Sequence, residues 1–383
     1  MTRVCIFITT FGDGGVERML VNLARGLSQL GIAVDFIVKT RQAPYLDRLP
    51  EQVRLIEFGS GNRKQRQRQL LTYVDETQPD VMISAKGKDD LIAMRVKHLT
   101  KAETRFFLRP GTAVSERLRA RNANWFKRWR THRRMRWLYA QTDGVIAVSN
   151  GVAEEIIGAT GVAANKVKVV RNPNITPELY DLAAAPLDHP WFTEGEDPVL
   201  LGIGGLRLQK DFPSLLRAFA LVNDKRPCRL MILGQGHLHD ELSALAESLG
   251  ISDRVALPGF VDNPYAYLAR ADLFVLSSLW EGSPNVLTES LALGTPVVAT
   301  DCKSGPNEIT QQGKFGHLVA VGDVQALAAA ILDTLANPPA SDWLKSAVQE
   351  YTMEKSAISY LKALGLPLPL NEPDNSQTDG EHV

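Results

Sequence analysis

Cysteine is scarce in this chain, and long apolar runs are missing. The 383 residues include three cysteines, Cys5, Cys228 and Cys302, which lie far apart. Their spacing fits neither a disulfide framework nor a metal site, so it favours a reducing compartment such as the cytosol. No apolar run reaches the ~20 residues of a membrane-spanning helix. The opening stretch MTRVCIFITTFG is too short for a secretory signal and is typical of a strand.

Two nucleotide-binding motifs are also missing. No Gly-x4-Gly-Lys-Ser/Thr string occurs, which argues against a P-loop nucleotidase. The glycine turn GDGG lacks the Gly-x-Gly-x-x-Gly spacing of a dinucleotide fold, which argues against a dehydrogenase. The class of protein must therefore be sought in other motifs.

Net charge is zero over the whole chain but not over its halves. Residues 1–180 hold 30 Lys and Arg against 17 Asp and Glu, whereas residues 181–383 hold 13 against 26. The first half is thus basic, which indicates a surface or partner of negative charge. Hydrophobic residues make up 44% of the chain, enough for a sizeable core.

Strand and helix patterns alternate twice along the chain. Strands are expected at 3–10, 32–38, 80–85 and 144–150, with a helix after the first glycine turn. A Pro-rich stretch at 172–198 is interpreted as a linker. Further strands are expected at 198–205, 228–236, 272–278 and 296–301, separated by helices. The pattern predicts two α/β domains with parallel sheets, residues 1–180 and 190–348, then a helix at 349–365 and a disordered tail at 366–383.

The stretch LWEGSPNVLTESLALGTPVVATD, residues 279–301, carries two acids, Glu281 and Glu289, separated by seven residues. A strand runs into a loop here, and a helix is expected to begin near Asn285 or Val286. Unpaired N–H groups at a helix start favour an anion such as a diphosphate. Carboxylates accept hydrogen bonds from the paired hydroxyls of a sugar or ribose. A capped helix with two solvated acids is the alternative interpretation.

Several motifs occur in the order found in one enzyme family. EGSPNVLTESLALGTPVVATD resembles the Glu-x7-Glu signature of retaining glycosyltransferases of family GT4, which have the GT-B fold. Other segments are similar to further parts of the family in the same order: FGDGGVERMLVNLARGLSQLGIAVDFIV, GVIAVSNGVAEEI, VVRNPNI, GLRLQKDFPSLLRAFA, LMILGQG and LPGFVDNPYAYLARADLFVLSS. The resemblance implies two Rossmann-like parallel-sheet domains facing each other across a cleft. The first would bind the acceptor and the second the nucleotide sugar, and the last helix would cross back onto the first.

The resemblance also implies roles for single residues. Glu281 would bind hydroxyls of the transferred sugar, Glu289 those of the ribose, and Lys210 the diphosphate, whose departure it would assist. Other positions would approach the donor through their backbone or a ring: Gly14 and Gly15 in the first glycine turn, Phe260 beside the base, and Gly282, Ser283, Asn285, Val286 and Leu287 around the sugar and diphosphate.

The sequence departs from the family at two points. Members usually carry an Arg directly after the strand-end Gly, but Gly205 stands there and Arg207 follows two residues later. The Arg207 side chain is long enough to reach the phosphates, so it is kept as a catalytic candidate; the alternative is a solvated loop residue. Many members also carry a His in the first domain. The matching stretch RFFLRPGTAVSERL has none, and Arg109 is its nearest polar candidate.

A basic segment with aromatic residues spans 116–140, ERLRARNANWFKRWRTHRRMRWLYA. Residues 117–136 hold nine Arg or Lys and no acid. This pattern is typical of a helix at a membrane surface, where each basic residue contributes about 1 kcal/mol near anionic lipid. We predict peripheral membrane contact or acceptor binding through Trp125, Lys127, Arg128 and Trp129. The alternatives are a solvated helix whose Trp residues pack into the core, and a nucleic-acid site, which no accompanying motif supports.

Taken with the resemblance, the sequence predicts a cytoplasmic retaining hexosyltransferase at the inner face of a membrane. It would move a sugar from a UDP- or GDP-sugar to a hydroxyl of a glycan or lipid-linked acceptor, in synthesis of cell-surface polysaccharide or lipopolysaccharide. Metal-dependent glycosyltransferases of the other main fold use an Asp-x-Asp pair, which this chain lacks. We therefore expect no metal ion and no cofactor, and no nucleic-acid partner. A nucleotide-sugar epimerase of the same fold and a sugar-nucleotide scaffold without turnover remain alternatives.

Overall fold

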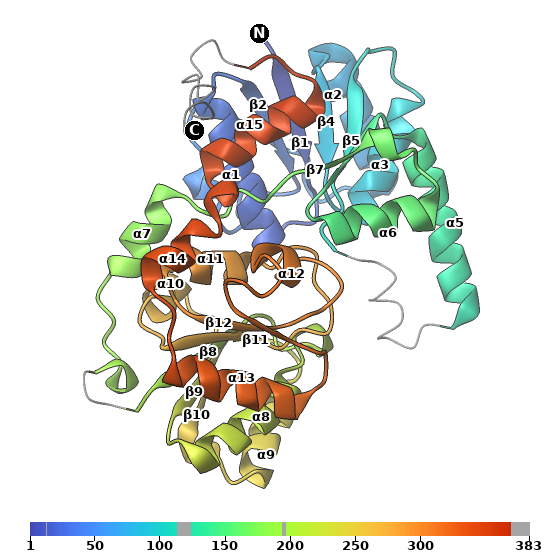
Figure 1. Ribbon diagram of the computed structural model, residues 1–383. Helices are drawn as coiled ribbons and strands as arrows, with labels where there is room; N and C mark the ends of the chain where they lie inside the picture. The colour runs from blue at the N-terminus through green and yellow to red at the C-terminus, as the bar shows by residue number, and fades with distance from the viewer. Residues whose placement is uncertain (13, 113–123, 194–196, 369–383) are drawn as a thin grey trace, which may run out of the picture. The chain divides into compact units, whose positions relative to one another are not determined.

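The computed structural model describes residues 1–383 except 13, 113–123, 194–196 and 369–383 (Figure 1). The disordered tail expected at 366–383 thus lies almost wholly outside the described residues, as does the first part of the basic segment at 116–140. The described strands form two parallel sheets of seven and six strands. The prediction of two parallel-sheet α/β domains is confirmed.

The first sheet has the order β3-β2-β1-β4-β5-β6-β7. Its strands are β1 (Arg3–Phe7), β2 (Ala33–Val38), β3 (Arg54–Glu57), β4 (Val81–Ser84), β5 (Arg105–Leu108), β6 (Gly144–Ala147) and β7 (Val167–Val169). The helices that follow these strands are α1 (Gly15–Gln29), α2 (Arg63–Thr77), α3 (Gly87–Lys97), α5 (Trp125–Gln141), α6 (Asn150–Thr160) and α7 (Pro177–Ala184).

The second sheet has the order β10-β9-β8-β11-β12-β13. Its strands are β8 (Val199–Ile203), β9 (Arg229–Leu233), β10 (Val255–Gly259), β11 (Leu273–Leu276), β12 (Val297–Thr300) and β13 (His317–Val319). The helices that follow along the chain are α8 (Phe212–Lys225), α9 (His239–Ser248), α10 (Pro264–Leu268), α11 (Asn285–Leu293), α12 (Pro306–Ile309), α13 (Val324–Ala336), α14 (Ser341–Ser346) and α15 (Met353–Leu364).

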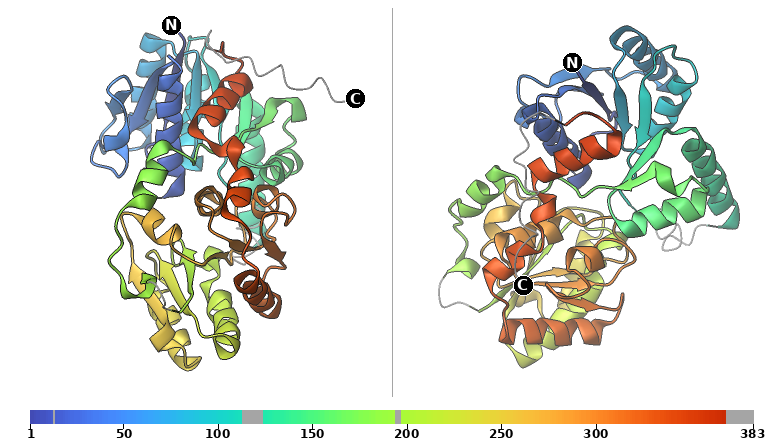
Figure 2. Two further views of the ribbon diagram at one scale, coloured as in Figure 1. Left: turned by 60° about the vertical axis from the view of Figure 1, so that its left-hand side comes forward. Right: turned by 45° about the horizontal axis from the view of Figure 1, so that its top comes forward.

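The chain divides into two compact units, Met1–Leu108 with Glu354–Val383, and Arg109–Met353. Almost all of α15 therefore belongs to the unit that holds the first five strands, and both figures of the whole chain show it beside those strands (Figures 1 and 2). The helix returns to the part of the fold where the chain begins.

A buried carboxylate joins three strands of the first unit. Asp35 is fully buried and accepts hydrogen bonds from Arg3 Nη1 at 2.9 Å, Arg54 Nε at 2.9 Å and Tyr73 Oη at 2.6 Å. The register brings Cys5, Asp35 and Arg54 opposite one another on β1, β2 and β3. Burial raises the pKa of the Cys5 thiol, so this cysteine is an inert packing residue.

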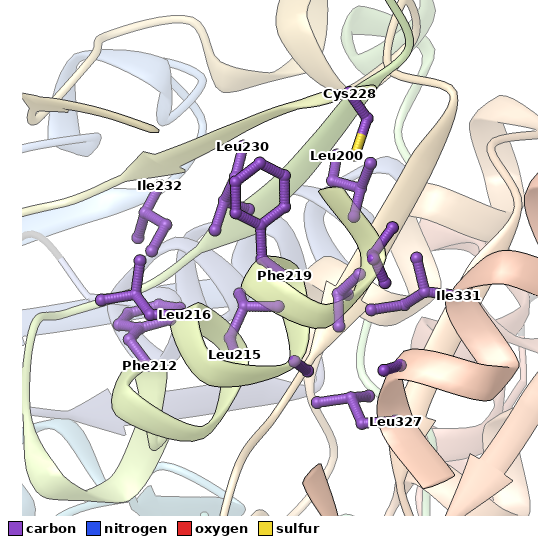
Figure 3. Packing of buried hydrophobic residues seen from close by; sticks show 14 of the residues in the cluster. Leu200, Phe212, Leu215, Leu216, Phe219, Cys228, Leu230, Ile232, Leu327 and Ile331 are labelled. Atoms are coloured by element: carbon purple, nitrogen blue, oxygen red, sulfur yellow. The ribbon is translucent and has the colours of Figure 1, made fainter. Parts of the chain in front are cut away.

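The six-stranded sheet is covered on both faces, because alternate residues of its strands point to opposite sides. Leu200, Leu230 and Ile232 pack with α8 and α13, including Phe219 and Ile331 (Figure 3). Their neighbours Leu201 and Met231 pack with α10, α11 and α14 on the other face. Two apolar layers thus hold the strands, and hence the loops after them, in place.

The stretch 172–198 is not a plain linker, as the turn-rich composition suggested. Helix α7 begins with Pro177 in its first turn, where a proline costs no hydrogen bond. Leu179 and Ala183 lie on one helical face and pack against Tyr265. The proline and small residues of this stretch suggested a loop, but part of it forms an amphipathic helix of two turns.

Phe219 tests the core of the second unit, because its side chain is fully buried on α8. We expect Phe219→Ala to lower the free energy of unfolding by about 3–5 kcal/mol, since it leaves a cavity. Urea denaturation followed by circular dichroism measures the change. Leu208→Ala, at a side chain that is 46% exposed, is the control and should cost less than about 0.5 kcal/mol. Equal losses in the two variants would contradict this packing.

Candidate functional site

Two loops of the second unit meet at one edge of the six-stranded sheet. β8 and β11 are adjacent and parallel, so the loops that leave their carboxyl ends open at the same edge. Leu279 N donates to Gln209 O at 2.8 Å, and Ser277 Oγ donates to Lys210 O at 2.7 Å. These bonds join the loop before α8 to the loop before α11.

Lys210 and Glu281 form an ion pair across these loops. Lys210 Nζ lies 2.7 Å from Glu281 Oε1, and the side chains are 18% and 8% exposed. Ser278 Oγ donates to the same carboxylate oxygen at 2.8 Å, and Gln209 Nε2 donates to Oε2 at 3.3 Å. The carboxylate is thus held by one cation and two polar side chains. The motif comparison named Lys210 and Glu281 but missed Ser278 and Gln209.

Two adjacent glycines make room for two cations. A Cβ on Gly204 would lie 2.6 Å from Cε of Lys210, and one on Gly205 would lie 2.9 Å from Nε of Arg207. The side chain of Lys210 therefore packs on the backbone of Gly204, and that of Arg207 packs on Gly205, just after β8. Arg207 is exposed and folds back over Gly205, the position at which the family usually carries its arginine.

The helix expected near Asn285 begins there, as α11. The residue before its first turn is Pro284, whose side chain makes no capping hydrogen bond. Gly282 lies so close to Gly111 that an added Cβ would come 2.1 Å from Gly111 O. Gly305, with φ of 93°, packs against Pro284 from another side. The approach to the helix start is therefore built of backbone groups.

Side chains at the start of α11 are buried and polar. Ser283 Oγ and Thr288 Oγ1 are buried and have no hydrogen-bond partner within the described part of the chain. Glu289 is 2% exposed in the second turn. Of the two acids in the motif, Glu281 thus lies in the loop and Glu289 on the helix, as the sequence predicted. Val286 and Leu287 lie in the first turn between them.

The other predicted donor residues lie apart from this loop in the sequence. Phe260 follows β10 at the edge of the second sheet and is 50% exposed. Gly14 precedes α1 and Gly15 begins it, both in the first unit. A Cβ on Gly14 would lie 2.9 Å from Oε2 of Glu17. The other oxygen of this carboxylate, Oε1, accepts from Gly12 N at 2.9 Å and lies 2.5 Å from Lys86 Nζ. Glu17 orders the first glycine turn.

The candidates of the basic segment lie on α5. Trp125 and Trp129 are 75% and 49% exposed, and Lys127 and Arg128 are exposed between them. The interpretation in which the tryptophans of this segment pack into the core is therefore wrong for α5. Arg109, by contrast, is almost fully buried, and its Nη2 donates to Asn172 Oδ1 at 2.5 Å.

Neighbouring ionisable groups add no further reactive site at this edge. Burial, reinforced by the charge of Glu281, raises the pKa of the Cys302 thiol to about 12. Cys302 is therefore a neutral packing residue near the ion pair at neutral pH. Over the described ranges, no group of three or more His, Cys, Asp or Glu side chains is arranged to hold a metal ion.

Sequence comparison finds relatives in several organisms. A region of 147 residues is 41% identical to an uncharacterized glycosyltransferase of Methanocaldococcus jannaschii, covering 38% of this chain and 36% of the relative. An N-acetylgalactosaminyltransferase acting on a diphospho-undecaprenol substrate in Campylobacter jejuni is 34% identical over 50% of each chain. The chain thus spans half or less of these two relatives. The Rhizobium meliloti lipopolysaccharide core biosynthesis glycosyltransferase LpsE is 28% identical over 85% of this chain and 86% of its own.

Solved structures share the fold. The lipopolysaccharide outer core galactosyltransferase WaaB has a TM-score of 0.72 at 19% identity, over 95% of this chain and 99% of its own. HepE of Anabaena, solved in complex with UDP, has a TM-score of 0.76 at 17% identity, over 95% and 100%. Both likenesses show the GT-B fold.

Two family models match consecutive parts of the chain. Residues 13–173 match Glycosyltransferase Family 4, and residues 188–351 match Glycosyl transferases group 1. The second match contains the Lys210–Glu281 pair and the whole of α11. With both halves matched in order and the fold shared over nearly the full length, the chain belongs to the GT4 family of glycosyltransferases.

Proposed function

We propose that this protein is a retaining hexosyltransferase that uses a nucleotide diphosphate sugar. The observation that carries the proposal is the buried Lys210–Glu281 pair, held 2.7 Å apart at the edge of the sheet beside the uncapped start of α11. A cation and the N-terminus of a helix suit a diphosphate, and a carboxylate suits sugar hydroxyls. The names of the relatives support a transferase rather than the epimerase or scaffold alternatives.

Lys210 and Glu281 supply the positive and negative charges that would bind the donor. Lys210 is neutralised by Glu281 when no donor is bound. A diphosphate at the start of α11 would draw the ammonium group toward its own oxygens, and Glu281 would then accept from hydroxyls of the sugar. Ser278 and Gln209 would keep the carboxylate in place during this exchange. Binding therefore replaces one ion pair by another, which limits the cost of desolvation.

Arg207 is proposed as the second cation for the diphosphate. Its guanidinium folds over Gly205, where the family arginine would begin. The planar guanidinium can bind two phosphate oxygens at once. With Lys210 and the helix start, it would neutralise the leaving group, so we propose that the transfer proceeds without a metal ion.

The transfer itself would then need position and charge rather than a strong base. The bond between the anomeric carbon and the phosphate oxygen breaks, and the acceptor hydroxyl forms its bond on the same face of the sugar. The acceptor proton passes to the departing phosphate. Lys210 and the α11 N–H groups stabilise the charge that develops there, which is a large contribution in a water-poor site. Glu289 would fix the nucleoside through its ribose.

We propose that the acceptor is a glycan or lipid-linked sugar of the cell surface, reached from the cytoplasmic side. The Campylobacter relative is named for a diphospho-undecaprenol-linked substrate and the Rhizobium relative for lipopolysaccharide core synthesis. No described helix combines the length and apolar character needed to cross a bilayer. Helix α5 supplies another means of contact with a membrane.

Helix α5 presents aromatic rings and basic groups together. Phe126 and Trp129 stack with ring centroids 6.0 Å apart, and Trp125 meets Phe126 edge-on at 5.9 Å. All three rings are at least 49% exposed. Arg133 lies over the Trp129 ring at 5.5 Å. Rings at headgroup depth and cations toward anionic phosphates would hold the helix at the membrane surface.

The donor site can be tested by ligand-induced stabilisation. We expect one of UDP-, GDP- or ADP-linked sugars to raise the melting temperature with EDTA present, and Glu289→Gln to abolish that rise. Differential scanning fluorimetry gives the shift. Stabilisation that appears only when a divalent cation is added would contradict the metal-free proposal, and stabilisation by no nucleotide sugar would contradict the function.

Lys210 should matter more for turnover than for folding. We expect Lys210→Met to reduce kcat/KM for the stabilising donor by about 100-fold or more, since a preorganised cation at the leaving group is lost. The loss is measured as the rate of donor hydrolysis, detected through the nucleoside diphosphate that is released. Lys225→Met, at the exposed end of α8, the helix that follows Lys210, is the control and should keep the wild-type rate. A wild-type rate in Lys210→Met would exclude Lys210 from the site.

Membrane contact through α5 predicts a specific loss. We expect Trp125→Ser combined with Trp129→Ser to weaken binding to phosphatidylglycerol vesicles by about tenfold or more, because two exposed rings are removed. Co-sedimentation measures binding, and added salt should weaken it in the wild type. Trp343→Ser, at a tryptophan 40% exposed on α14, should leave binding unchanged. Equal effects of the two sets would show that α5 is not the contact.

A further inference from the structure

Arg109 is a buried cation with no acidic partner in the part of the chain that the structure describes. Its side chain is 2% exposed, and its Nη2 donates to Asn172 Oδ1 at 2.5 Å. Nε and Nη1 are buried and have no acceptor in the part of the chain that the structure describes. A guanidinium cannot shed its proton in a protein. An unpaired buried charge is costly, so its retention calls for a function.

Two other arginines of this chain, each paired with an acid, show what a structural role looks like. Arg171 Nη1 lies 2.6 Å from the carboxylate of Glu308. Arg54 donates through Nε and Nη2 to both oxygens of Asp35, at 2.9 and 2.5 Å. Each of these side chains is less deeply buried than Arg109 and is neutralised by an acid. Arg109 has a neutral amide as its partner instead.

The surroundings of Arg109 lead to the start of α11. Asn172 accepts a hydrogen bond from Arg109, and its Nδ2 donates to Asn285 Oδ1 at 2.9 Å. Asn285 is the first residue of α11. Two residues after Arg109, the carbonyl of Gly111 touches Gly282. The guanidinium is thus linked to the loop in which Glu281 and the helix start lie.

Further unsatisfied donors occur beside this chain of bonds. Ser283 Oγ, two residues before Asn285, and Asn174 Nδ2, whose backbone N–H donates to Asn172 O at 2.9 Å, are both buried without partners among the described residues. Each can donate a hydrogen bond. A region with one cation, two unpaired donors and a helix N-terminus is short of acceptors, and an oxyanion supplies acceptors and negative charge together.

We propose that Arg109 binds a phosphate group of a substrate, next to the start of α11. This inference rests on the proposed function and deepens it. The phosphate has two possible sources with the same chemistry, namely the diphosphate of the donor and a phosphate carried by the acceptor. In either case the substrate removes the electrostatic penalty of the buried guanidinium. Arg109 is also the nearest polar candidate in RFFLRPGTAVSERL, the stretch that lacks the histidine carried by many members of the family.

The test compares stability and anion affinity in the full-length protein. Arg109→Met keeps the length of the side chain and removes the charge. We expect its melting temperature without ligand to stay within about 2 °C of wild type or to rise, because an unpaired buried charge is lost. Its affinity for pyrophosphate, UDP or orthophosphate, measured by isothermal titration calorimetry, should fall by about tenfold or more. Arg109→Lys should retain part of the affinity, since the charge stays and the planar set of donors is lost.

Separate probes distinguish the two sources. Loss of pyrophosphate and UDP affinity in Arg109→Met assigns the guanidinium to the donor diphosphate. The other outcome is that Arg109→Met keeps its affinity for UDP but no longer binds orthophosphate in the presence of saturating UDP, as the wild type does. That result assigns the guanidinium to a phosphate of the acceptor. Arg105→Met, which removes one positive charge from the preceding strand, is the control and should keep both affinities.

Two results would overturn the proposal. One is affinity for all three probes within about twofold of wild type in both Arg109 variants, when the wild type itself binds them. The other is a wild type that binds no anion while Arg109→Met melts well below it, which would make Arg109 a structural residue. Failure of the proposed function looks different: the wild type would then bind no nucleotide sugar, whereas orthophosphate binding that depends on Arg109 would persist.

Discussion

The ion pair between Lys210 and Glu281 is the interaction on which this site depends. It joins the loops after β8 and β11, which are neighbouring strands, and it does so at a depth where neither charge is fully hydrated. Alone, Glu281 would be a buried carboxylate with two neutral donors, and Lys210 would be a cation beside Gly204. Together they form a neutral, preorganised unit. The unit can be exchanged for contacts with a substrate that carries both an anion and hydroxyls.

Close approach of backbones is the second constraint. Gly204 and Gly205 leave room for the side chains of Lys210 and Arg207, and Gly282 leaves room for the carbonyl of Gly111. A methyl group at Gly282 would meet backbone, which cannot move aside as a flexible side chain can. The loop that leads into α11 therefore requires glycine at this position for its packing.

Much of this arrangement could be predicted from the sequence, because it depends on local patterns. Glycine turns followed by apolar residues at helical spacing predicted α1, α8 and α11, and the position of Glu281 before a helix and Glu289 within it followed from the spacing. The sequence left both an exposed and a core-packed position open for Trp125 and Trp129, and it did not predict helix α7, since composition alone does not say which face finds a partner. The bonds from Arg109 to Asn172 and from Asn172 to Asn285 join residues 63 and 113 positions apart. No local pattern reports contacts of that range.

The site therefore combines two electrostatic conditions that have opposite consequences. The charges of Lys210 and Glu281 cancel, so this pair costs little while the site is empty and gives up an existing bond when a ligand enters. Arg109 has no acid to neutralise it among the residues that the structure describes, so it costs stability while the site is empty and gives up no ion pair on binding. For a ligand that contacts both, the favourable free energy of pairing with Arg109 offsets the free energy lost when the Lys210–Glu281 bond breaks. Affinity for an anionic substrate would then depend most on the residue that contributes least to the stability of the free protein, which is the relation expected where stability has been traded for function.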